Sequence, residues 1–220
     1  MGSEYCLQGF RHVMTPPSAA LRDRWLEALL PRVPDTGWTL AAARDAAQAA
    51  GLSAGDQALA APGGISDLLE HFFDQAELDT ADRIAATDLG DYKVHEKVAF
   101  GVRTWLDVLE PHRDAVKRAS ARGFTPWGAP GATRRTWSVA DTVWTAIGDT
   151  SADYNYYTKR GLLASVIAPI VLYWQTLPSD EDLDRFIANR LRQAMKFGQA
   201  GGRVLRPILD RFTPGPAPSA

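Results

Sequence analysis

The stretch around which this chain is organised is residues 148–160, GDTSADYNYYTKR. It gathers three tyrosines, two carboxylates and two cations immediately before the apolar run of residues 161–174. Tyrosine and arginine supply large, stiff contact areas and are enriched at binding hot spots. An oxygen of Ser151 or Asp153 can cap the helix that starts here. The pattern therefore predicts a capped helix, whose tyrosines either pack inside the molecule or face a partner.

The same stretch resembles the signature of the "Coq nine" family, which are lipid-binding accessory proteins of ubiquinone (coenzyme Q) biosynthesis. The likeness extends more loosely over roughly residues 21–195. Tyr156 departs from the pattern, because the family often has tryptophan at that position. The matching positions are Trp144, Gly148, Asp149, Ser151, Asp153, Tyr154, Asn155, Tyr157, Thr158, Lys159, Arg160, Leu163, Asp184, Phe186 and Arg190.

This resemblance implies a function. A family member would be a non-catalytic protein with a TetR-like fold, which binds a polyprenylated quinone precursor and presents it to the pathway's di-iron hydroxylase. It would form a homodimer through its last long helices, bind no cofactor or metal, and be a cytoplasmic protein peripherally associated with the inner membrane, or lie on the mitochondrial matrix side in a eukaryote. The implied hydroxylase-docking residues are Asp149, Asp153, Tyr154, Asn155, Tyr156, Tyr157, Lys159 and Arg160.

Size and composition set broad limits. The chain has 220 residues, of which 45% are hydrophobic, and a net charge of −2, so one compact unit is the default. The longest apolar stretch, residues 162–174, is shorter than the roughly 18 residues typical of a membrane-spanning helix. A single cysteine, Cys6, excludes an internal disulfide framework and suits a reducing compartment. We expect no secretory signal at the N-terminus.

Helical spacing of apolar residues recurs along the chain and strand signals are nearly absent, which predicts an all-α fold. Residues 123–135 are rich in glycine and proline and are expected to form a loop. Ser138 is expected to cap the following helix with Asp141, and Pro169 to kink the next one. The expected helices span about residues 21–33, 40–50, 53–61, 66–84, 94–109, 112–122, 138–147, the signature to 176, and 179 onward.

The first helices, residues 18–86, look like the helix-turn-helix head of TetR-type repressors, which reads DNA with its third helix. No lysine or arginine occurs between Arg44 and Arg83, whereas eight acidic residues do. DNA affinity rests largely on cations that neutralise phosphates. We therefore expect a degenerate head that does not bind nucleic acid. A ligand-responsive transcriptional regulator of the TetR type is the alternative function.

A lipid pocket is expected in the bundle formed by residues 87–200. Three of its helices carry large apolar side chains that would enclose one core, and the family resemblance implies that this core takes an isoprenoid. Burying one five-carbon isoprene unit contributes roughly 3–4 kcal/mol. A core that is simply packed is the alternative. The candidate lipid-binding residues are Trp105, Leu106, Leu109, Val143, Trp144, Ile147, Leu163, Val166, Ile167, Ile170 and Trp174.

Residues 201–220 combine positive charge with an apolar stripe. From Arg185 onward the chain has seven cations and one acid. Gly201 and Gly202 are expected to form a hinge before a basic amphipathic helix, which can lie in a bilayer interface. Docking on the protein body or on a second subunit is the alternative, and the proline-rich residues 213–220 are expected to be disordered. The expected membrane-docking residues are Arg203, Val204, Leu205, Arg206, Ile208, Leu209, Arg211 and Phe212.

Residue types that perform catalysis do not form a recognisable pattern. The four histidines are scattered, and His95-Glu96 lacks the second histidine of a zinc motif. No Glu-x-x-His pair is present, so the chain lacks the ligand pattern of a helical di-iron hydroxylase. We therefore expect no enzyme activity. A third hypothesis is a structural dimeric module without a ligand.

Overall fold

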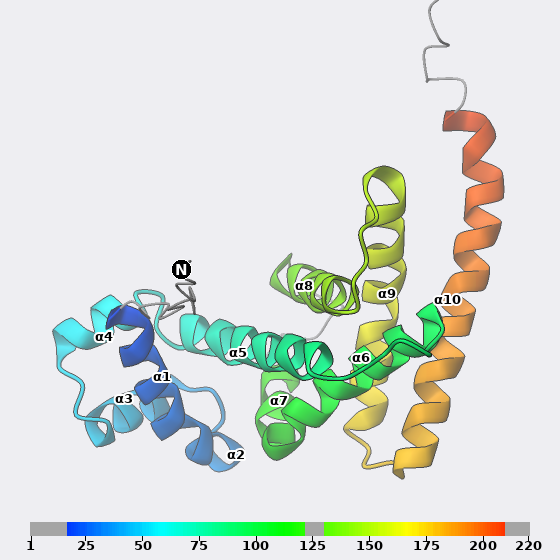
Figure 1. The fold of residues 1–220 in the computed structure, drawn as a ribbon. Helices are drawn as coiled ribbons and strands as arrows, with labels where there is room; N and C mark the ends of the chain where they lie inside the picture. The colour runs from blue at the N-terminus through cyan, green and yellow to red at the C-terminus, as the bar shows by residue number, and fades with distance from the viewer. Residues whose placement is uncertain (1–16, 122–129, 210–220) are drawn as a thin grey trace, which may run out of the picture. The chain divides into compact units, whose positions relative to one another are not determined.

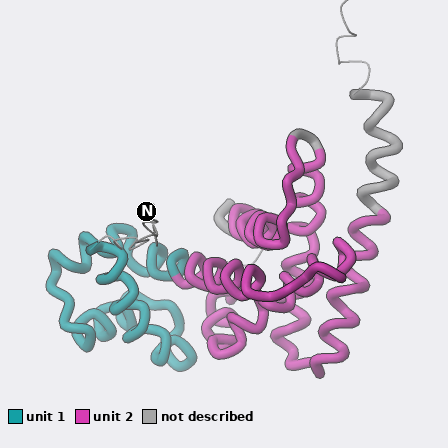
Figure 2. The backbone as a smooth tube through the Cα atoms, viewed as in Figure 1, with its two compact units in different colours: residues 1–71 teal, residues 72–220 magenta. Residues whose placement is uncertain are grey.

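The computed structural model describes residues 17–121 and 130–209, with the backbone alone described for residues 130–132, 153–154 and 197–209. All regular elements in this part of the chain are helical, so the all-α prediction is confirmed. The chain divides into two compact units, residues 1–71 and 72–220 (Figure 2). The expected domain limits at residues 86 and 200 stay predictions.

Short helices build the first unit (Figure 1). Two helix starts are capped by side chains, because Thr39 Oγ1 accepts a hydrogen bond from the Ala42 amide at 3.1 Å and Ser53 forms a capping box with Asp56. The Trp25 indole donates to the Ala43 carbonyl at 2.8 Å and joins the first helix to the third. The helices are α1 Pro17–Leu29, α2 Val33–Thr36, α3 Leu40–Ala49, α4 Ala54–Ala60 and the beginning of α5 Ile65–Ala85, with a 3-10 turn at Leu30–Arg32.

Longer helices form the second unit. Its last two helices run side by side in opposite directions (Figure 1). Tyr173 stacks on Phe186 across them, with 4.2 Å between the ring centroids, and the Arg190 guanidinium lies 4.7 Å from the Phe186 ring. After the rest of α5, the elements are α6 Val94–Leu109, a 3-10 turn at Glu110–His112, α7 Arg113–Ala121, α8 Pro130–Ala146, α9 Asp153–Trp174 and α10 Asp180–Leu209.

A close helix crossing positions α8, on which the site described below depends. Gly101 of α6 is buried, and a Cβ atom there would lie 2.7 Å from Val143 Cγ1 of α8 and 3.3 Å from Ile84 Cδ1 of α5. Both distances are shorter than ordinary carbon contacts. Glycine is therefore needed at residue 101 for the three helices to approach this closely.

The structure corrects several local predictions. Residues 130–135 are helical rather than loop, because Pro130 stands at the first position of α8, where its missing N–H and fixed φ are tolerated. Ser138 consequently lies inside α8 and caps nothing; its hydroxyl donates to Glu77 Oε2 at 2.6 Å. Helix α10 continues through Gly201 and Gly202, where a hinge was predicted. Two glycines weaken a helix by about 1 kcal/mol each, which its other residues can offset.

Two further predictions concern the membrane and α9. No described helix is both long and apolar enough to cross a bilayer. Helix α9 continues through Pro169, and its neighbours Ala168 and Ile170 are buried; the kink stays a prediction. The predicted loop at residues 123–129 and the predicted disorder of residues 213–220 fall outside the described residues.

Candidate functional site at the α8–α9 junction

The end of α8 sets the geometry of the signature. The amide of Gly148 donates to the Thr145 carbonyl at 3.0 Å, and the amide of Asp149 donates to the Trp144 carbonyl at 2.9 Å. This pair of bonds is a Schellman motif, which requires a residue in the left-handed region. Gly148 supplies it with φ +84°. The glycine thereby turns the chain so that Asp149 comes back toward its own helix.

Asp149 is the centre of a polar cluster. Its carboxylate accepts hydrogen bonds from Ser151 Oγ at 2.8 Å, Lys159 Nζ at 2.7 Å and Arg160 Nη1 at 3.2 Å, and its side chain is only 7% exposed. Lys159 also donates to Ser151 Oγ at 2.6 Å. Neither predicted cap forms, since Ala152 is the N-cap of α9 and Asp153 its first residue. The Ser151 hydroxyl instead donates its hydrogen bond to Asp149.

Arg160 joins the two helices. Its guanidinium, in a side chain 2% exposed, pairs with Asp141 of α8 as well as with Asp149. It lies 3.5 Å from the centre of the Tyr156 ring, and the Tyr156 hydroxyl donates to Asp141 at 2.9 Å. We call Asp141, Asp149, Tyr156, Lys159 and Arg160 the clamp. Residues 156, 159 and 160 share one face of α9, because side chains three and four apart on a helix are neighbours.

Three pKa values follow from these contacts. Burial raises the pKa of Asp149, but the hydrogen bonds from Lys159, Ser151 and Arg160 outweigh it, so that the pKa lies below its usual value. Burial lowers the pKa of Arg160, and its bonds to Asp141 and Asp149 reverse that effect and raise it. The hydrogen bond to Asp141 raises the pKa of the Tyr156 phenol. At neutral pH Asp149 and Arg160 therefore form a charged pair, and the Tyr156 phenol keeps its proton.

Other signature residues face outward. Tyr157 is 64% exposed, and Asn155 is exposed beside it. The Tyr157 ring contacts Tyr156 edge-on at 5.1 Å and lies 6.2 Å from the Trp137 ring, measured between centroids. An aromatic side chain held from two sides loses little entropy on binding, which suits it to a protein interface.

A second polar cluster holds α8 against α5. Glu77 is buried and accepts hydrogen bonds from Arg135 at 3.0 Å, Ser138 at 2.6 Å and Thr142 at 3.1 Å. Arg135 also pairs with Asp74 at 2.7 Å. Burial lowers the pKa of Arg135, and the bonds to the two carboxylates reverse that effect and raise it.

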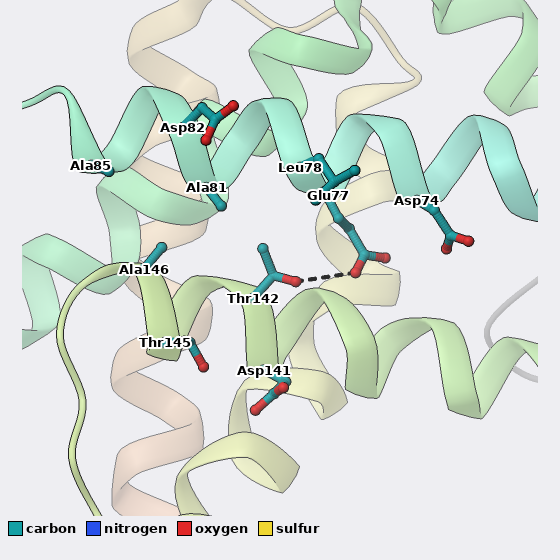
Figure 3. Close-up of a pocket in the computed structure, with 10 residues that line it drawn as sticks. All are labelled: Asp74, Glu77, Leu78, Ala81, Asp82, Ala85, Asp141, Thr142, Thr145 and Ala146. Atoms are coloured by element: carbon teal, nitrogen blue, oxygen red, sulfur yellow. Dashed lines mark hydrogen bonds between the residues drawn. The ribbon is translucent and has the colours of Figure 1, made fainter. Parts of the chain in front are cut away.

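A cleft of about 690 Å³ opens beside this second cluster (Figure 3). It adjoins the clamp, because Asp141 belongs to both. One wall comes from α5 and the other from α8. The α5 wall consists of Asp74, Glu77, Leu78, Ala81, Asp82 and Ala85. The α8 wall consists of Asp141, Thr142, Thr145 and Ala146.

Apart from Ile147, which directly follows α8, the candidate lipid-binding residues lie on three helices that pack on one another, α6, α8 and α9. All are buried except Ile147, which is half-buried. None of them lines the α5–α8 cleft. The Trp174 indole donates to Glu110 at 2.9 Å, whereas the Trp105 indole N–H is buried without any hydrogen-bond partner among the described residues. A lipid-sized space within this set stays a prediction.

Sequence reasoning missed Asp141 and Arg135. The sequence predicted Asp141 to take part in a helix cap. Asp141 lies one helical turn before Trp144, which is one of the positions that match the family pattern. That spacing could have placed Asp141 at the α8–α9 junction. The side chains of Asp153 and Tyr154 lie outside the described residues, as do the side chains of Arg203, Val204, Leu205, Arg206, Ile208 and Leu209 and the whole of Arg211 and Phe212.

Comparisons with known proteins agree with the signature. Residues 129–198, which contain the α8–α9 junction, match the sequence profile of the COQ9 family. The chain is 31% identical over 193 residues to the "Ubiquinone biosynthesis protein COQ9, mitochondrial" of Bos taurus, and 30% identical over 193 residues to the protein of the same name from Homo sapiens. Each match covers 84% of this chain and 60% of the relative. The chain thus spans about three fifths of the length of these relatives.

Proposed function

Because this chain belongs to the COQ9 family, we propose that it is a non-catalytic accessory protein of ubiquinone biosynthesis, which binds a polyprenylated quinone precursor at a membrane surface and presents it to the di-iron hydroxylase of the pathway. The docking role is supported by a difference between two groups of residues within the segment 148–160. The clamp satisfies its own charges internally, and Tyr157 remains exposed on the rigid helix that the clamp fixes.

The docking surface would centre on Tyr157, with Asn155 beside it. Asp149 and Arg160 would not touch the hydroxylase, because both side chains are almost fully buried in contacts with each other and their neighbours. Their role would be to hold α9 against α8. This assignment narrows the set of docking residues that the family resemblance implies.

Lipid binding would use the apolar core of α6, α8 and α9. The unpaired Trp105 N–H supports a ligand that carries oxygen, because a buried donor without a partner costs about 1–3 kcal/mol, and a ligand oxygen would recover it. The relatives are named as mitochondrial. For this chain we propose a peripheral position on a membrane, reached through the basic residues beyond Lys196.

Native mass spectrometry of gently purified protein tests the lipid proposal. We expect a co-purifying isoprenoid, which Ile170→Trp excludes by filling the buried core. The matched control is Leu172→Trp, an exposed position on the same helix, which should retain the lipid. Circular dichroism establishes that both variants are folded. The proposal fails if the wild-type protein carries no isoprenoid and takes up none from added polyprenyl quinone.

Capture of the purified di-iron hydroxylase tests the docking proposal. Tyr157→Ala should weaken binding by at least about tenfold, as expected for an aromatic hot spot. Leu172→Ala removes another exposed apolar side chain from α9 and should leave capture unchanged. Equal binding of the two variants would remove Tyr157 from the interface.

A further inference from the structure

The cleft between α5 and α8 has the form of a groove for one helix (Figure 3). Its α5 wall runs from Asp74 to Ala85 at spacings of three and four, so these residues lie on one helical face. At 1.5 Å per residue this wall is about 17 Å long, or three helical turns. Half of the ten lining residues are alanine or threonine. Side chains of this size let the backbone of another helix come close.

Leu78 and Asp82 lie one helical turn apart on the α5 wall, and both are exposed. The Leu78 side chain is 58% exposed, although it borders a concave surface. The Asp82 carboxylate forms no hydrogen bond or ion pair with any residue in the described part of the chain. The other three carboxylates of the cleft are each paired with an arginine. The cleft thus combines apolar surface with an unpaired negative charge, which is complementary to a basic amphipathic helix.

The cleft adjoins the proposed docking surface at Tyr157. Tyr156 connects the two, because its ring contacts the Tyr157 ring at 5.1 Å between centroids and its hydroxyl donates to Asp141 at 2.9 Å. Asp141 in turn lines the cleft. A partner that packs on Tyr157 is therefore one side chain away from the groove. We propose that the di-iron hydroxylase lays a basic amphipathic helix in the α5–α8 cleft, beside its contact with Tyr157.

This inference rests on the proposed docking function and adds two contacts to it. An apolar side chain of the inserted helix would cover Leu78, and a lysine or arginine one turn along the same face would pair with Asp82. The clamp would hold the cleft next to Tyr157, since Asp141 and Thr145 of its α8 wall both contact Arg160. The charge pair would fix the orientation of the hydroxylase and speed its association.

Isothermal titration with the purified di-iron hydroxylase tests the two contacts separately. Asp82→Lys should weaken binding by about tenfold at low salt. This effect should disappear in about 1 M salt, where the screening length falls to about 3 Å. Leu78→Ser should weaken binding by about tenfold at both salt concentrations, because burial of an apolar side chain is not screened.

Asp79→Lys is the matched control for the charge change. Asp79 is exposed on α5 but does not line the cleft, and its replacement alters the net charge as much as Asp82→Lys does. We expect Asp79→Lys to bind the hydroxylase like the wild type at both salt concentrations. Circular dichroism establishes that all three variants are folded.

The outcomes separate this inference from the docking function. If Tyr157→Ala weakens binding while Asp82→Lys and Leu78→Ser bind like the wild type, the groove proposal is wrong and the docking function stands. If the wild type does not bind the hydroxylase, both are wrong. Equal weakening by Asp79→Lys would show that only net charge matters, and would overturn the groove contact. Asp82→Lys that alters sedimentation of the chain alone, with hydroxylase binding unchanged, would assign the groove to a second copy instead.

Discussion

The two halves of the signature place similar residue types in opposite surroundings. Tyr156, Lys159 and Arg160 turn toward α8 and are held by carboxylates and by one another. Tyr157, one residue along the helix from Tyr156, is the most exposed of the described aromatic residues. The difference shows that density of polar and aromatic residues does not by itself mark an interface. Helical phase decides which of them pack against α8 and which face outward.

Breaking the clamp should have the largest effect on stability. Arg160→Ala leaves Asp141 and Asp149 without their shared cation, and removal of one partner of a buried ion pair costs about 3–5 kcal/mol. We expect the lower end of this range, because Asp149 keeps its ion pair with Lys159 and the Asp141 side chain is 43% exposed. Urea unfolding measures the change. Arg185→Ala is the control, because its ion pairs with Glu181 and Asp182 are exposed and worth less than about 1 kcal/mol. An equal decrease in unfolding free energy in the two variants would show that the clamp does not stabilise the fold.

Disturbing the contact between α6 and α8 at Gly101 should have the second-largest effect on stability. Gly101→Ala places a Cβ atom 2.7 Å from Val143 Cγ1, and overpacking of this kind costs about 1–3 kcal/mol. At Gly161 of α9 the nearest side-chain atom is 3.9 Å away, on Trp137. Gly161→Ala should therefore be neutral or stabilising by up to about 1 kcal/mol. Thermal unfolding of both variants decides; similar melting temperatures would contradict the close approach of α6 to α8.

The clamp should also make stability depend on pH. The folded pKa of Asp149 lies below its unfolded value, so its contribution is fully present above the unfolded pKa of about 3.9 and is lost as pH falls through the folded pKa. Asp149→Asn lacks this contribution. The difference in unfolding free energy between wild type and Asp149→Asn should therefore shrink as pH falls from 6 to 3. A difference that stays constant over this interval would show that the carboxylate is not specifically stabilised in the fold.

A pair of tryptophans should give the smallest effect and test the contrast between paired and unpaired buried groups. Trp174→Phe removes an indole that donates to Glu110, whereas Trp105→Phe removes a donor with no partner in the described structure. Both lose similar packing, so Trp105→Phe should cost about 0.5–1.5 kcal/mol less than Trp174→Phe, the net contribution of one hydrogen bond. Chemical denaturation of the two variants measures it, and a reversed order would contradict the pairing.

Much of the helical framework could be predicted from the sequence, because glycine, proline and capping residues act locally. Thr39 and Ser53 cap their helices through hydrogen bonds within the first turn. The errors arose where a tertiary contact replaced a local one. Ser138 and Asp141 fit a capping box by spacing, yet one bonds to Glu77 and the other to Arg160. Proline at residue 130 started a helix that the surrounding glycines had suggested was a loop.

The candidate site was predictable as a region but not as a set of roles. The sequence located residues 148–160 correctly as one cluster at the start of a helix. It could not tell that Lys159 and Arg160 face α8 while Tyr157 faces outward, because that depends on how α8 crosses α9. For the same reason Tyr156 and Lys159 are poor probes of docking, since altering either also disturbs the clamp.

The most direct test of the account measures hydroxylase binding and stability on the same preparations. Isothermal titration with the di-iron hydroxylase and urea unfolding are applied to wild type, Tyr157→Ala and Arg160→Lys. We predict that Tyr157→Ala weakens binding by at least about tenfold with an unchanged unfolding free energy, and that Arg160→Lys lowers the unfolding free energy. Undiminished hydroxylase affinity in Tyr157→Ala, or an unfolding free energy lowered as much as in Arg160→Lys, would contradict the division of the signature into a clamp and a docking surface.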